Sequence, residues 1–315
     1  MKCMALFAGL MIASASAPAQ YPNKPVRVVI PFVVASSTDT ITRIITDAMA
    51  KGMGQPVIID NKPGADAMIA GADVVKARAD GYTLLIGTGS QAAVPALRKS
   101  PPYDPVADFT PVADIGRFSM FLYVNADVPA KSFRELLAYA RANPGKLNYA
   151  TSSVSNIVAS AQMHAMGDIK LTAVPYKSSP QAMLDLVTGR VQVMWDPPTT
   201  GMPYVKDGKL RVLVTGNVTR SGLLPEVPTI YESGMPQFSM PAWMGVLGPA
   251  KLPRDIADRL NREVVSAMKR PEVMAETEKQ AFFLNPSSPA RFGEFFLEQI
   301  EVHSRILRAA GVEQQ

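Results

Sequence analysis

Short apolar runs alternate with helix-length amphipathic segments along most of the chain. Runs rich in β-branched and aromatic residues predict strands at 26–30, 56–60, 82–87, 120–125, 147–151, 171–176, 191–196, 210–216 and 243–249. Between many of these runs lie segments with the apolar spacing of helices, such as 38–51, 66–77 and 251–270. This alternation predicts an α/β fold with two mainly parallel sheets.

Several predicted helices carry their own start signals. Ser132 and Glu135 have the spacing of a capping box, and Ser179 and Ser288 each precede a proline that suits the first helical position. No internal repeat and no low-complexity linker divides the chain. We therefore expect two α/β units joined by short crossings, with the proline-rich stretches near 101–111 and 225–241 as surface or crossing segments.

The N-terminal residues have the pattern of a secretory signal peptide. Lys2 precedes a short apolar centre and a run of small residues, which predicts a signal peptide at 1–19 and export into a periplasm. Cys3 is the only cysteine, so the mature chain is expected to hold no disulfide. With 47% hydrophobic residues in a chain of 315, the core is large enough without one.

Composition and motifs exclude several kinds of chemistry. The formal charge of +5 is spread thinly, so no nucleic-acid partner is expected. His164 and His303 fall in helical patterns and are expected to be surface or packed residues, which leaves no zinc site. The dinucleotide-like spacing of Gly87, Gly89 and Ala92 lacks a second strand that ends in an acidic residue, so no cofactor is expected.

Hydroxyl-rich turns follow four of the predicted strands, at 35–39, 88–91, 151–156 and 177–181. The carboxyl ends of parallel strands share one edge of a sheet, where helix N-termini offer unpaired N–H groups to an anion. Each turn taken alone is more typical of plain helix capping, but four together favour a site for a carboxylate. Asp196, at the end of a strand, is placed to meet a hydroxyl or amine of a ligand.

A resemblance to a known family runs along essentially the whole mature chain. The segments that carry it include "YPNKPVRVVIPF", "GQPVIIDNKPGA", "DGYTLLIG", "PYDPVADFTPV" and "VPYKSSPQAMLDLVTGRVQVMWD". In this order they resemble the Bug-type receptors, the periplasmic substrate-binding proteins of tripartite tricarboxylate transporters. The resemblance implies a two-lobed Venus-flytrap fold of the type II-like periplasmic binding proteins, with a ligand cleft between the lobes. One lobe would comprise residues 20–124 and 231–315, and the other 125–230.

The resemblance also implies where the ligand is held. In the family a ligand carboxylate sits on the first strand-to-helix loop, and further loops line the rest of the cleft, with Asp196 facing the distal part of the ligand. The residues predicted to bind ligand are Val33, Val34, Ala35, Ser36, Ser37, Thr38, Asp39, Thr88, Gly89, Ser90, Ser152, Ser153, Asn156, Ser178, Ser179 and Asp196. No catalytic residue and no metal ligand is expected.

The first loop departs from the usual family pattern. Its common Pro-Pro-Gly-Gly-Ala is replaced here by residues 33–37, and the loss of both glycines is expected to restrict positive φ. Val33, Val34 and Trp195, with no arginine in the proposed loops, predict a narrow apolar cleft. An apolar or aromatic mono- or dicarboxylate is therefore favoured over a polyhydroxylated or tricarboxylic acid.

The sequence thus predicts a monomeric, non-enzymatic periplasmic receptor that delivers a small organic carboxylate to transporter subunits in the membrane through transient contacts. Two alternatives stay open. A ligand sensor that feeds a signalling system would use the same binding step, and an enzyme that acts on a bound carboxylate is a more distant possibility.

Overall fold

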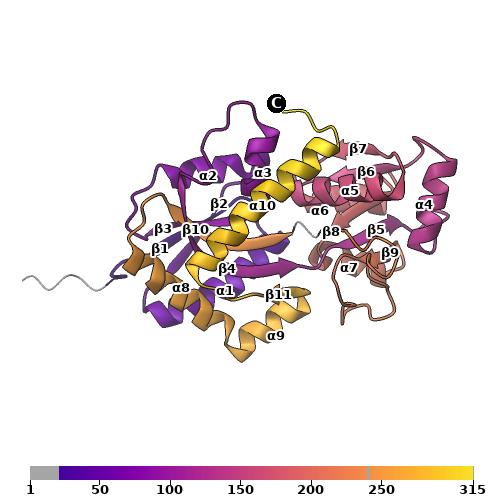
Figure 1. The fold of residues 1–315 in the computed structure, drawn as a ribbon. Helices are drawn as coiled ribbons and strands as arrows, with labels where there is room; N and C mark the ends of the chain where they lie inside the picture. Colours follow the sequence, from indigo (N-terminus) through magenta and orange to yellow (C-terminus); the bar gives the residue numbers. More distant parts are fainter. Residues whose placement is uncertain (1–20, 240–241, 315) are drawn as a thin grey trace, which may run out of the picture.

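The computed structural model describes residues 21–239 and 242–314, so the predicted signal peptide at 1–19 lies outside the described residues. Two β-sheets stand side by side, each covered by helices (Figure 1). The first sheet has the strand order β11-β4-β10-β3-β1-β2. Its strands are β1 (Val26–Ile30), β2 (Val57–Asn61), β3 (Thr83–Thr88), β4 (Phe109–Phe118), β10 (Trp243–Pro249) and β11 (Phe282–Leu284).

Both faces of the central strands of the first sheet are buried, as expected for strands with helices on either side. Val28 and Ile30 pack with helices α1 and α8, whereas Val29 packs with α2, α3 and α10. The helices associated with this sheet are α1 (Ser37–Met53), the short 3-10 helix η1 (Ala65–Ala67), α2 (Met68–Val75), α3 (Gly89–Leu97), α8 (Arg254–Met268), α9 (Pro271–Lys279) and α10 (Pro289–Ala309).

The second sheet has the strand order β7-β6-β8-β5-β9. Its strands are β5 (Phe121–Asn125), β6 (Asn148–Thr151), β7 (Thr172–Pro175), β8 (Val193–Asp196) and β9 (Leu210–Thr215). Helices α4 and α5 pack on one face, and α6 and α7 on the other. These helices are α4 (Phe133–Ala142), α5 (Val154–Gly167), α6 (Ser179–Val187) and α7 (Pro198–Lys206).

The α/β architecture is confirmed, but both sheets are mixed rather than mainly parallel. Pairs β1–β2, β1–β3, β6–β7 and β6–β8 are parallel, and the other neighbours are antiparallel. The physical reason lies in how the chain crosses between the sheets. Strands β5 and β10 each enter a sheet from the side of the other sheet, so they run against the neighbours between which they insert.

Two strands, β4 and β11, were not predicted from the sequence. In β4, Pro111, Asp114 and Gly116 interrupt the apolar pattern, and the pairing with β10 contains two register shifts. Pro111 is tolerated there because β11 pairs only with the far end of β4, which leaves the region of Pro111 at a sheet edge. The start of this strand therefore overlaps a stretch that the sequence indicated as a surface or crossing segment.

The predicted helix starts are largely confirmed. Ser132 accepts a hydrogen bond from the Glu135 N–H, and Ser288 accepts one from the Arg291 N–H. The third start is shifted by one residue, because Ser178 is the cap of α6 and Ser179 is its first helical residue. None of the described helices is both long and apolar enough to cross a membrane.

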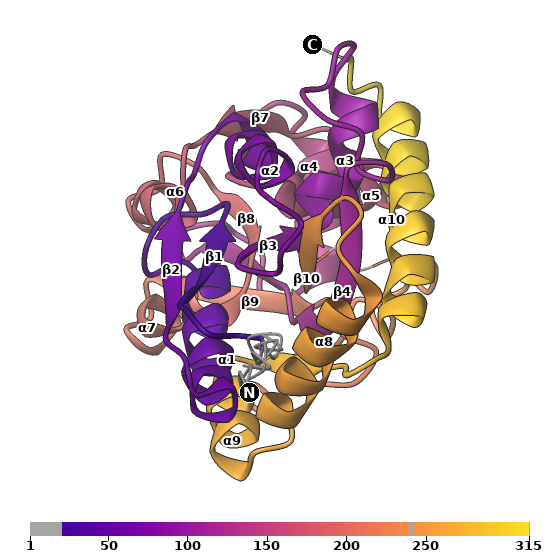
Figure 2. The ribbon, with the colours of Figure 1, turned by 90° about the vertical axis from the view of Figure 1, so that its left-hand side faces the viewer.

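Helix α10 crosses from the first sheet to the second and packs on helices from both (Figures 1 and 2). Leu307 of α10 meets Ala93 and Leu97 of α3, and Val154 and Val158 of α5, in one apolar cluster. We call this cluster the three-helix seam. It joins two helices that both begin at the cavity described next.

Candidate ligand-binding site

A cavity of about 470 Å³ opens between the loops of the two sheets. Its walls come from the carboxyl ends of β1, β2 and β3 in one sheet and of β6 and β7 in the other, where open α/β sheets usually bind ligands. The lining residues are Pro31, Phe32, Val33, Ser36, Pro63, Gly64, Ala65, Asp66, Ala67, Ser90, Ser152, Ser153, Tyr176, Lys177, Ser178 and Ser179.

A smaller inner chamber of about 60 Å³ adjoins this cavity and shares several of its walls. The shared residues are Phe32, Ser36, Ser153 and Ser179. The chamber adds Ser37, Thr38, Thr88 and Asp196, together with apolar residues close to where the chain passes between the sheets, among them Phe118, Met120, Ala242 and Trp243. It reaches the start of α1 on one side and the end of β8 on the other.

The helices α1, α3, α5 and α6 all begin at these two cavities. In α1, the side chain of Ser36 accepts a hydrogen bond from the Asp39 N–H at 3.2 Å, and its carbonyl accepts one from Thr40 at 2.9 Å. The first two N–H groups of the helix, on Ser37 and Thr38, have no partner inside a helix. Both residues line the inner chamber, so the N-terminus of α1 is available to an anion.

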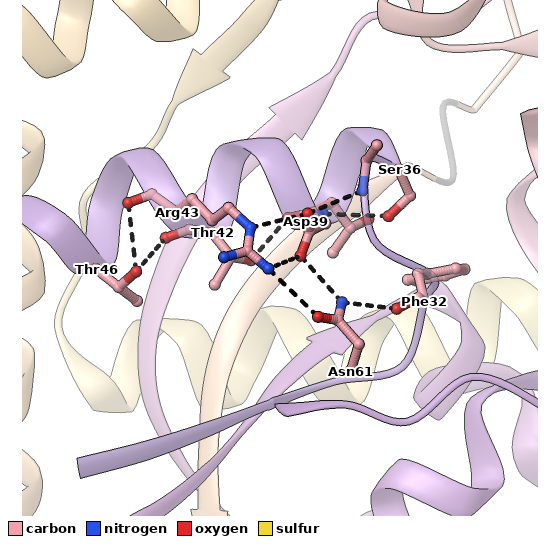
Figure 3. A network of polar contacts seen from close by, with 9 residues as sticks. Phe32, Ser36, Asp39, Thr42, Arg43, Thr46 and Asn61 are labelled. Atoms are coloured by element: carbon pink, nitrogen blue, oxygen red, sulfur yellow. Dashed lines mark hydrogen bonds and ion pairs between the residues drawn. The ribbon is translucent and has the colours of Figure 1, made fainter. Parts of the chain in front are cut away.

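Asp39 lies beside the first loop and holds it through hydrogen bonds (Figure 3). Its carboxylate accepts hydrogen bonds from Ala35 N–H, from Arg43 through two nitrogens and from Asn61 Nδ2, all at 3.0 Å. Asn61 Nδ2 also donates to the carbonyl of Phe32 at 2.9 Å. Burial raises the pKa of Asp39, but the bonds from Arg43, Asn61 and Ala35 outweigh it and hold that pKa below its usual value. Asp39 therefore fixes the loop shape.

Ala35 stands at the place of one of the missing glycines and has a positive φ nonetheless. Its φ is 63°, in the left-handed region, where a residue with a Cβ costs roughly 1–2 kcal/mol. The sequence predicted that losing the glycines would restrict positive φ, and this was wrong. The bond from Ala35 N–H to the buried Asp39 carboxylate holds the strained turn in place.

On the other side of the cavity, serine side chains form a connected network. The hydroxyls of Ser152 and Ser179 lie 2.9 Å apart, and Ser179 donates to Asp196 at 2.8 Å. Ser153 caps α5 through the Asn156 N–H at 3.3 Å, and Asn156 in turn accepts from Ser152. The loops after β6, β7 and β8 are thus linked by side-chain hydrogen bonds.

The structure brings most of the predicted site residues together. Those that line one or both cavities are Val33, Ser36, Ser37, Thr38, Thr88, Ser90, Ser152, Ser153, Ser178, Ser179 and Asp196. Those it does not bring to either lining are Val34, Ala35, Asp39, Gly89 and Asn156. Val34 is 63% exposed and points to solvent, while Asp39 and Asn156 lie beneath the surface that they support.

Trp195 does not narrow the cleft as the sequence suggested. It is fully buried and packs on Phe238, with ring centroids 5.4 Å apart. Strand side chains alternate in direction, so the ligand-facing position at the end of β8 belongs to Asp196 and its neighbour faces the core. The apolar wall of the cavity is made instead by Phe32 and Val33 with the 63–67 loop.

The 63–67 loop and Tyr176 were missed by the sequence analysis, whereas Lys177 lies in the predicted turn 177–181 without having been named as a ligand-binding residue. The 63–67 loop follows β2, so the strand-end argument applied to it, but it lacks the hydroxyl residues that marked the other loops. Lys177 is exposed and is the one lysine or arginine among the described residues that line the two cavities. Asp66, at the same rim, is paired with Arg98 at 3.0 Å.

Both histidines are packed against neighbouring residues and line neither cavity, as the sequence predicted. His164 stands edge-on to Tyr149 at 4.9 Å, and burial lowers the pKa of His164 to about 4. His303 is fully buried, with Nδ1 at 2.8 Å from the Gln299 carbonyl. Within residues 21–239 and 242–314, no group of three or more His, Cys, Asp or Glu side chains is placed to hold a metal ion.

His303 makes stability depend on pH. Burial lowers its pKa to about 4, although the bond to Gln299 acts in the opposite direction. The unfolded chain takes up this proton near pH 6.5, so unfolding is favoured as pH falls from about 6.5 towards 4. We expect His303 to contribute about 2 kcal/mol of the loss between pH 7.5 and 4.5, measured by urea unfolding as the difference between the wild type and His303→Gln. His303→Gln should lose less over this range, and an equal loss in the variant would contradict this assignment.

The sequence and the fold of this chain match those of a known receptor family. The profile of the tripartite tricarboxylate transporter family receptor matches residues 41–312, most of the chain. The chain belongs to this receptor family. The receptor is also similar to the periplasmic binding protein BugD, at 26% identity and a TM-score of 0.86, over 94% of this chain and 100% of that one. The resemblance to Bug-type receptors and the two-lobed fold are thereby confirmed.

Two solved relatives of the receptor carry small acids. A protein of R. palustris with adipate has 30% identity and a TM-score of 0.88, and the match covers 94% of this chain and 100% of that one. MatC from Rhodopseudomonas palustris with bound malate has 30% identity and a TM-score of 0.83, over 91% of this chain and 100% of that one.

Proposed function

We propose that this solute-binding receptor works in the periplasm, where it captures a small organic carboxylate in the cavity between its sheets and delivers it to membrane subunits of a tripartite transporter. The observation that carries the proposal is the convergence of four helix N-termini on a cavity where Lys177 is the single basic residue among the described lining residues. Helix N-termini carry a partial positive charge and unpaired N–H groups, which suit a carboxylate without an arginine.

The cavity favours a ligand with an apolar body. Its volume of about 470 Å³ falls in the range of small-molecule sites, and Phe32, Val33 and Ala65 supply apolar walls. The ligand class that fits best is a mono- or dicarboxylate, aliphatic or aromatic. The binding of adipate and of malate by two relatives supports this class. A tricarboxylate would bring three charges to one lysine and is disfavoured.

Capture is proposed to depend on closure of two lobes that follow the two sheets. The loops of both sheets contribute to the cavity, so moving the sheets apart would open it. Thr199 of α7 donates to the side chain of Gln280, after α9, at 2.9 Å, a contact that opening would have to break. Closure excludes water and strengthens the hydrogen bonds to the carboxylate.

A ligand screen tests the proposed function. Adipate, hexanoate and benzoate are expected to raise the unfolding temperature, because a ligand that binds only the folded state stabilises it by mass action. Citrate should give little or no shift at the same concentration. Thermal-shift measurements at pH 7.5 followed by calorimetry would check this, and tight binding of citrate with no binding of the other acids would overturn the proposal.

A further inference from the structure

A buried carboxylate, Asp196, closes the inner end of the binding site. It ends β8, is 1% exposed and lines the inner chamber together with Ser179. Its oxygens accept hydrogen bonds from the hydroxyl of Ser179, at 2.8 Å, and from that of Thr200. In the described part of the chain its partners are these hydroxyls and the amide of Asn156, with no ion pair to a basic side chain.

The charge of Asp196 at neutral pH follows from its surroundings. Burial raises its pKa to about 6, and hydrogen bonds from Thr200, Ser179 and Asn156 act in the opposite direction. The side chain is therefore ionised at pH 7.5, where it can only accept hydrogen bonds. Ser179 and Thr200 must each turn the proton of their hydroxyl towards it.

A second fixed acceptor, the side-chain oxygen of Asn156, lies beneath the same surface. Asn156 Nδ2 donates to the carbonyl of Trp195, which turns Oδ1 towards the serines. Oδ1 accepts from the N–H and the hydroxyl of Ser152, each at 2.9 Å, and from the hydroxyl of Ser153 at 3.0 Å. The orientation of this amide is thus set by the backbone of β8.

The protons of all three serines are consequently used inside the protein. Ser179 gives its proton to Asp196, and Ser153 gives its proton to Asn156. The hydroxyl of Ser152 lies 2.9 Å from both Asn156 Oδ1 and Ser179 Oγ. Whichever of these two atoms accepts its proton, that proton is used inside the protein. Because a hydroxyl carries one proton and two lone pairs, what these serines offer the cavity is lone pairs. This wall, which we call the acceptor wall, comprises Ser152, Ser153 and Ser179.

We propose that the acceptor wall selects a ligand with a hydroxyl or amino group at the end opposite its carboxylate, and that Asp196 is the positioning residue that sets this polarity. The inference rests on the proposed function and places the ligand carboxylate at the start of α1, where the N–H groups of Ser37 and Thr38 have no partner inside the helix. A donor on the ligand completes the wall with a hydrogen bond. A methyl ether at the same place would bring lone pairs against lone pairs and lose affinity.

Matched pairs of acids test the selectivity. We would compare 6-hydroxyhexanoate with 6-methoxyhexanoate, and 4-hydroxybenzoate with 4-methoxybenzoate, by calorimetry at pH 7.5. In each pair the methyl group removes the donor and keeps the oxygen. The wild-type receptor is expected to bind the hydroxyl member about tenfold more tightly, the loss typical of one hydrogen bond with an unpaired partner.

Variants assign this preference to the network. In Asp196→Asn the new amide can donate to Ser179, which frees the hydroxyl proton of Ser179 for the cavity, and the preference should fall towards onefold. Ser179→Ala removes part of the wall and one hydrogen bond to Asp196 but keeps the carboxylate itself, and it should also reduce the preference. It serves as the second test in case Asp196→Asn folds poorly. Asp207→Asn is the control, because it makes the same charge change on an exposed residue at the end of α7 and should keep the preference.

The outcomes separate this inference from the proposed function. Acids that bind without preference for the hydroxyl, or a full preference retained in both Asp196→Asn and Ser179→Ala, would overturn the inference and leave the carboxylate receptor standing. Failure of all four acids to bind would overturn the proposed function and the inference with it. A preference that disappears in both variants and persists in Asp207→Asn supports the assignment.

Discussion

Ser37→Asp is expected to weaken binding of 6-hydroxyhexanoate by about a hundredfold or more. Ser37 is the first residue of α1 and lines the inner chamber, where the N-terminus of the helix is proposed to hold the ligand carboxylate. A second carboxylate there competes for the same N–H groups. At roughly 4 Å and an effective dielectric constant of about 20, two like charges repel by about 4 kcal/mol. Calorimetry at pH 7.5 measures the change.

A matched control separates repulsion from effects on the fold. Ser288 is the exposed cap of α10, and an aspartate is an equally good cap, so Ser288→Asp adds the same charge at a helix start away from the cavity. Its affinity for the same acid should equal that of the wild type. Binding by Ser37→Asp within a few-fold of the wild type would show that the carboxylate is held somewhere else.

Phe292→Ala is expected to lower the free energy of unfolding by about 3–5 kcal/mol. Phe292 of α10 is fully buried and stands edge-on to Trp243, with ring centroids 6.0 Å apart. Its ring lies directly over Gly245 of β10, so closely that a Cβ at that glycine would be 2.3 Å from the ring. Removing the ring leaves a cavity between helix and sheet that the backbone of β10 cannot fill. Urea unfolding at pH 7.5 would give the difference.

Leu297→Ala on the same helix provides the comparison. Leu297 is 49% exposed, so its truncation removes little buried surface, and we expect a change of less than about 1 kcal/mol. Similar losses in the two variants would mean that the aromatic cluster around Trp243 contributes much less than its burial implies.

The sequence predicted the parts of the fold that depend on local pattern. Strands such as Val26–Ile30 and Trp243–Pro249 have the predicted bounds, because continuous apolar runs mark strands buried on both faces. Strand direction depends on where the chain crosses between sheets, which no local pattern records. The antiparallel insertion of β5 and β10 was missed for that reason, and β4 was missed because its bulges and Pro111 disturb the apolar pattern.

The candidate site was predictable where a residue type has one common structural role. Hydroxyl residues after strands mark helix starts, and those of α1, α3, α5 and α6 do line the cavities. Whether a side chain points into the core or into the cavity was harder to predict. Trp195 and Asp196 are neighbours, yet one packs in the core and the other faces the chamber. The carboxylate of Asp39 is paired inside the protein with Ala35 of its loop, Arg43 of its helix and Asn61 of β2. The contact with Asn61 could not be predicted, because it depends on β2 lying beside the loop.

The three-helix seam bears on whether either half of the molecule can exist alone. The chain crosses between the sheets twice, yet α10 returns to cover Val154 and Val158 of α5 with Leu307. A fragment cut at the two crossings would leave those valines in contact with water, at a cost proportional to the apolar area uncovered. The two halves are distinct in architecture, but we expect them to unfold together, because α10 packs on apolar residues of both.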